Sequence, residues 1–102
     1  MRKQKKLINT LNGNGNVYKD GISISNVNYT IYISQEFTDD LPGIKEIKGY
    51  IKVVKGERNL TDGSVLTLKL ADNREWQFLA LSGIPIDARY EAHNVSGSGL
   101  SE

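Results

Sequence analysis

The chain of 102 residues carries 13 basic and 12 acidic side chains, a formal net charge of +1, and 38% of its residues are hydrophobic. This balance is typical of a folded globular domain, because disordered chains have fewer hydrophobic residues and a larger net charge. Cysteine is absent, which excludes disulfides, thiolate nucleophiles, cysteine-ligated zinc and iron–sulfur clusters. The near-zero net charge lacks the positive excess that nucleic-acid-binding domains usually carry.

The length predicts one domain, which we place at residues 1–95, followed by a flexible Ser/Gly-rich tail over residues 96–102. The basic start, Met1–Lys6, is not followed by the apolar stretch of a signal peptide. No apolar run is long enough for a transmembrane helix. We therefore expect a cytoplasmic protein that does not associate with membranes.

Turn-forming residues are frequent in the first quarter of the chain. Asn12–Asn16 alternates asparagine with glycine, and Asp20-Gly21 follows it closely. Both residue types tolerate positive φ, so we expect two tight turns, with Leu7–Leu11 as the first arm of a hairpin.

The segment from Ile22 to Ser34 alternates as a β-strand does, but its apolar parity changes. Ile24 occupies an even position, whereas Val27 and Tyr29 occupy odd ones. A straight strand would turn one set toward water, so we expect a β-bulge or bend near Ser25-Asn26 that directs both Ile24 and Tyr29 into one core.

A loop is expected over Gln35–Gly43, because Leu41-Pro42-Gly43 suits a type II turn. The next strand, Ile44–Val54, contains Gly49 on its apolar face. Glycine weakens a strand interior, so we expect an aromatic ring to cover it, from Tyr29, Trp76 or Phe78.

Two further strands, Ser64–Ala71 and Glu75–Leu81, form a hairpin. Burying Leu68 and Leu70 with Trp76 and Phe78 requires an odd-length loop, predicted as residues 72–74, which would pair Leu70 with Trp76 and Leu68 with Phe78. A bulge in either arm would serve equally. Residues 84–95 fit either a strand or a short helix. The fold class is therefore all-β: a small antiparallel barrel or partly open roll of about six strands.

Catalytic patterns are weak. The single histidine, His93, lies in the ill-defined C-terminal stretch, and no nucleophile motif accompanies it. Asp62 and Asp72 lie in turns and match no calcium-loop spacing. We expect no enzyme activity, no cofactor and no metal.

One surface remains a candidate binding site. Antiparallel pairing that sets Tyr29 opposite Ile51 places four residues on the outward face of two strands, Tyr32, Lys48, Tyr50 and Lys52. Aromatic rings that stack on bases, beside cations that meet phosphates, are typical of single-stranded nucleic-acid binders.

We expect a non-catalytic binding or interaction module whose partner the sequence does not identify, either a protein or a second copy of the chain. The alternative is a binder of single-stranded nucleic acid or another anionic ligand through the Tyr/Lys face.

Overall fold

The computed structural model describes residues 3–84 and 87–95, and in these ranges it contains six β-strands and no helix. The strands are β1 (Lys3–Lys19), β2 (Ile22–Thr38), β3 (Leu41–Gly56), β4 (Leu66–Lys69), β5 (Glu75–Ile84) and β6 (Arg89–Asn94). The C-terminal segment that the sequence left open between strand and helix is thus the strand β6. The predicted tail over residues 96–102 lies outside the described residues.

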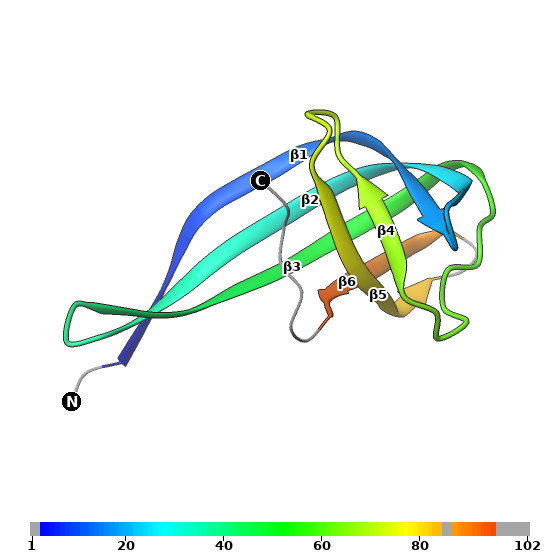
Figure 1. The fold of residues 1–102 in the computed structure, drawn as a ribbon. Helices are drawn as coiled ribbons and strands as arrows, with labels where there is room; N and C mark the ends of the chain where they lie inside the picture. The colour runs from blue at the N-terminus through cyan, green and yellow to red at the C-terminus, as the bar shows by residue number, and fades with distance from the viewer. Residues whose placement is uncertain (1–2, 85–86, 96–102) are drawn as a thin grey trace.

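All six strands join one antiparallel sheet that closes on itself in the order β1-β2-β3-β6-β5-β4 (Figure 1). Consecutive strands form two three-stranded meanders, β1-β2-β3 and β4-β5-β6. The β3–β6 ladder joins the meanders on one side, and a short β1–β4 ladder joins them on the other. The predicted all-β class and the ring-like antiparallel arrangement of six strands are confirmed.

The first three strands are longer than the ring and continue past it as a three-stranded arm (Figure 1). They contain 17, 17 and 16 residues, and the longest dimension of the molecule is 47 Å. The loop predicted over Gln35–Gly43 is wrong, because β2 runs on to Thr38 and β3 begins at Leu41.

A two-residue turn at Asp39 and Asp40 connects β2 to β3. Both aspartates have positive φ, 50° and 67°, as the central residues of a type I′ turn do. This turn matches the twist of paired strands, so it sets the hairpin instead of the Pro-Gly pair. Pro42 lies within β3 opposite Phe37. At Pro42, no described strand pairs with the edge of β3 that faces away from β2. The N–H group that proline lacks is therefore not needed for a ladder on that edge.

The Asn-Gly segment is also not the turn that was predicted. Asn12–Asn16 continue β1 and pair with β2, whereas the turn predicted at Asp20-Gly21 is present. Asn12, Asn14 and Asn16 are exposed, and Gly15 between them is buried. On the outer face of the sheet, the side chains of Asn14 and Asn16 form hydrogen bonds with asparagine side chains of β2.

The predicted irregularity in β2 is confirmed. The register of β2 against β1 changes between the pairs Val17–Ser25 and Tyr18–Ser23, which leaves Ile24 as the extra residue, immediately before the Ser25-Asn26 site predicted for it. After this bulge Val27 and Tyr29 are buried, and Ile24 packs against the same core. The bulge restores the inward face, as the parity argument requires.

The β4–β5 hairpin has the predicted odd-length loop, but the register differs by two residues. Leu68 pairs with Trp76 instead of Phe78, and the loop consists of residues 71–73. Its last residue, Asn73, has φ 70°, the left-handed position that closes a three-residue hairpin loop. The predicted loop would have placed Arg74 there, and asparagine tolerates that conformation better.

The core fills the ring with residues from all six strands and from the β3–β4 loop, including the predicted hairpin residues. The largest fully buried side chains are Trp76, Phe78, Ile31, Leu60, Leu66, Leu68, Val17 and Val27. Trp76 stacks against Phe78 at a centroid distance of 5.5 Å and covers Gly49, as predicted.

Gly49→Val is expected to lower the free energy of unfolding by about 1–3 kcal/mol, because it overpacks this contact. A Cβ at residue 49 would lie 3.2 Å from Trp76 Cζ3 and 3.0 Å from the Thr30 carbonyl oxygen. Thermal melts can compare it with Tyr50→Thr on the outward face, which we expect to lose far less. Equal small losses in both variants would contradict the packing argument.

Candidate functional site

The predicted β2–β3 register is confirmed at each pair that defines the outward face. Tyr29 pairs with Ile51, and Tyr32 pairs with Lys48. Tyr50 and Lys52 pair with the β2 residues 30 and 28. Because side chains alternate along a strand, the four predicted site residues share the outer face of the sheet.

Two tyrosines form an exposed aromatic pair on this face. The rings of Tyr32 and Tyr50 meet edge to face, with a centroid distance of 6.2 Å and an interplanar angle of 76°. Tyr32 is 37% exposed and Tyr50 is 46% exposed, so each ring has surface left for a ligand. An edge-to-face arrangement at this separation is one that aromatic pairs prefer.

Lys48 already has a partner. Its Nζ lies 3.2 Å from Glu91 Oε1 and 5.9 Å from the centroid of the Tyr50 ring. The hydrogen bond to Glu91 raises the pKa of Lys48, so the ammonium group stays charged but locally neutralised. Lys48 and Lys52, which the sequence pattern does not distinguish, therefore differ in their electrostatic surroundings: Lys48 has an acidic partner.

Lys52 faces a second cation that the sequence reasoning missed. It pairs across the β3–β6 ladder with Arg89, and both residues are exposed. Neither forms a salt bridge within the described part of the chain. Like charges directly opposite each other destabilise a sheet, so sheet stability does not explain this pair.

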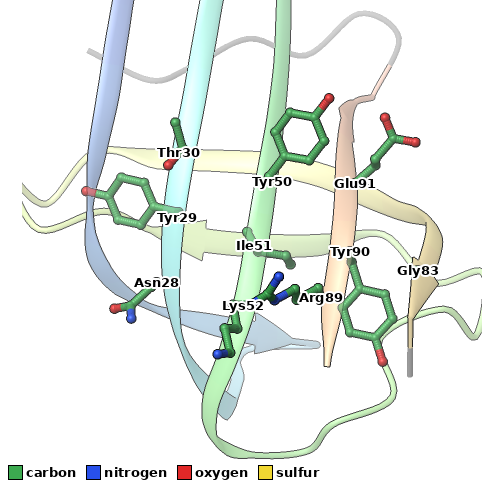
Figure 2. Close-up of a pocket in the computed structure, with 10 residues that line it drawn as sticks. All are labelled: Asn28, Tyr29, Thr30, Tyr50, Ile51, Lys52, Gly83, Arg89, Tyr90 and Glu91. Carbon is green, nitrogen blue, oxygen red and sulfur yellow. The ribbon is translucent and has the colours of Figure 1, made fainter. Parts of the chain in front are cut away.

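Tyr50, Lys52 and Arg89 line a groove on the outer face of β2, β3 and β6, which Gly83 of β5 also borders (Figure 2). Its volume is about 600 Å³. Its lining consists of Asn28, Tyr29, Thr30, Tyr50, Ile51, Lys52, Gly83, Arg89, Tyr90 and Glu91. Tyr32 and Lys48 lie one row further along the same face.

Asparagine amides extend the polar surface from the groove onto β1. Asn14 Nδ2 donates to Asn26 Oδ1 at 2.8 Å and to Asn28 Oδ1 at 3.0 Å. Asn28 pairs with Lys52 across β2 and β3, so the row Asn14, Asn28, Lys52 and Arg89 crosses four neighbouring strands. A row of this length offers hydrogen-bonding groups to an extended ligand.

The turn carboxylates are engaged locally. Lys19 and the Ser64 backbone N–H hold the pKa of Asp62 at about 2, and hydrogen bonds from Arg74 lower the pKa of Asp72. His93 lies half-buried on β6 opposite Lys48 and Leu79. In residues 3–84 and 87–95 no group of three or more His, Cys, Asp or Glu side chains is placed to hold a metal ion.

Comparisons with known proteins identify no relative. No family matches the sequence, and neither the curated proteins nor the solved structures yielded a match. Among the described residues there is also no helix with the length and hydropathy of a membrane span.

Proposed function

We propose that this chain is a non-catalytic binding module that holds an anionic ligand on the outer face of β2, β3 and β6. One observation carries the proposal: Lys52 and Arg89 stand opposite each other at the groove without an acidic partner among the described residues. An anion between them would relieve their repulsion and accept charge-assisted hydrogen bonds.

The chemistry of the groove suits binding better than catalysis. Its lining includes no histidine, cysteine or serine, so it lacks the Ser–His or Cys–His pair of common covalent catalysts. Arg89 presents a planar fork that can meet two oxygens of a phosphate or carboxylate, and Lys52 adds a mobile point charge. Asn28 adds an amide beside Lys52.

The proposal predicts that inorganic pyrophosphate shifts the backbone amide NMR signals of residues 52 and 89 at low ionic strength. The shifts should shrink as salt is added, since exposed charges are screened. The double variant Lys52→Gln/Arg89→Gln should bind about tenfold more weakly or worse, given the usual value of hydrogen bonds to charged groups.

Lys55→Gln is the matched control, because Lys55 is an exposed lysine of the same strand that does not line the groove. It should keep nearly full affinity. Equal losses from Lys55→Gln and from the double variant would mean that diffuse charge attracts the anion, and no response at millimolar pyrophosphate in low salt would overturn the proposal.

A further inference from the structure

We infer that the anionic ligand is single-stranded nucleic acid, with a phosphate between Lys52 and Arg89 and an adjacent base on Tyr50. This inference rests on the proposed function, because it assigns the ligand of the same groove. It also divides the face into a phosphate row and a base row, which the predicted Tyr/Lys site did not distinguish.

The phosphate row crosses β2, β3 and β6 as Asn28, Lys52 and Arg89. Its two cations have no salt bridge in the described part of the chain, and its amide is neutral. It is therefore the part of the groove with uncompensated positive charge, and phosphate contacts provide most of the affinity of sequence-independent nucleic-acid binding.

The base row lies next to the phosphate row on the same strands and consists of Tyr32, Lys48, Tyr50 and Glu91. Tyr50 is two residues from Lys52, so their Cα atoms are roughly 6.6–6.8 Å apart along β3. A nucleotide whose phosphate sits at Lys52 can therefore bring its base to the exposed Tyr50 ring. Tyr32 contacts Tyr50 edge-on and presents a second ring for the following base.

The charge of the base row is balanced. Glu91 pairs across the ladder with Tyr50, and its carboxylate holds Lys48. An aromatic surface with balanced charge favours stacking over phosphate contact, because Lys48 already has an anion. Glu91 can also accept a hydrogen bond from an exocyclic amino group of a base. Lys48 is thus a positioning residue, and Lys52 and Arg89 contact the phosphate.

A free phosphate or an inorganic polyphosphate would use the cation row and leave the tyrosines unused. The distinguishing experiment therefore compares two labelled oligomers of equal length and charge, oligothymidylate and an abasic oligodeoxynucleotide. Fluorescence anisotropy at low salt should show oligothymidylate binding about tenfold more tightly, the order expected for stacking of a single base.

Substitutions in each row test which row binds the base and which binds the phosphate. Tyr50→Thr should weaken oligothymidylate to near the affinity of the abasic oligomer, whereas Tyr50→Phe keeps the ring and should retain the preference. Arg89→Gln should weaken both oligomers and lower the dependence of affinity on salt by about one counterion. Lys48→Gln should leave that salt dependence nearly unchanged.

The outcomes separate this inference from the proposed function. Equal binding of the two oligomers by the native protein would overturn the assignment of nucleic acid and leave an anion-binding module. Binding of neither oligomer, together with no pyrophosphate response, would overturn both. Loss of abasic binding in Tyr50→Thr would also contradict the division into rows, provided that circular dichroism shows the variant folded.

Discussion

Trp76→Ala is expected to lower the free energy of unfolding by about 3–5 kcal/mol, the usual cost of truncating a buried large aromatic side chain. Trp76 is fully buried, stacks on Phe78 and covers Gly49. Its Nε1 also donates a hydrogen bond to Asn94 Oδ1 at 2.9 Å, which links β5 to the end of β6. Truncation removes all of these contacts at once, and the glycine offers no side chain to fill the cavity.

Urea denaturation followed by far-ultraviolet circular dichroism measures this loss, since the only tryptophan of the chain is removed. If the alanine variant does not fold, Trp76→Phe can replace it. It keeps part of the ring and should fold with a smaller loss of stability. Val54→Thr is the control, because Val54 is 56% exposed and should change stability by no more than about 0.5 kcal/mol. A loss below about 1 kcal/mol in Trp76→Ala would show that this ring does not organise the core.

The parts of the fold that could be predicted from the sequence are those determined by the alternation of apolar and polar residues along the strands. The parity change between Ile24 and Val27 located the bulge, and pairing Tyr29 with Ile51 fixed the β2–β3 register. The inward-facing glycine at position 49 predicted that an aromatic ring covers it, which Trp76 does. In each case burial leaves one register that hides the apolar residues, so local pattern determines a tertiary feature.

The errors share a different cause. Asparagine, aspartate and glycine each serve both turns and strands, and tertiary neighbours decide between the two. Asp39 and Asp40 form the turn that was assigned to Pro42-Gly43. Asn12–Asn16 remain a strand because they pair with β2 along their whole length, and the amides of Asn14 and Asn26 also bond to each other across the two strands.

The candidate site was predicted in part. Tyr32, Tyr50 and Lys52 share the expected face, but Arg89 and Glu91 belong to a strand that the sequence did not establish. Their contribution depends on the β3–β6 ladder, which joins segments far apart in the chain. The alternation of Tyr90 and Ala92 inward with Arg89 and Glu91 outward was the available signal, and a short helix explained it equally well.

Gly15→Ala is expected to destabilise the protein by about 3 kcal/mol or more, at or beyond the upper end of the range for overpacking. Gly15 is buried where β1 approaches the end of β4, and an added Cβ would lie 2.3 Å from the Lys69 carbonyl oxygen. A backbone oxygen cannot move aside as a side chain can. The strand must shift, and the ladder beside it, Asn16–Tyr18 against Thr67–Lys69, is what closes the ring.

Two measurements test this closure. Urea denaturation gives the loss of stability, and hydrogen exchange of those residue 16–18 amides that bond to β4 instead of β2 should show the β1–β4 ladder opening more readily than the β2–β3 ladder. Gly43→Ala is the matched control, since its Cβ would meet its nearest atom, the Glu36 carbonyl oxygen, at an ordinary 3.4 Å. It should be neutral or slightly stabilising, because alanine restricts the unfolded chain. Similar stability of the two variants, with unchanged protection at residues 16–18, would mean that close approach to β4 is not why glycine occupies position 15.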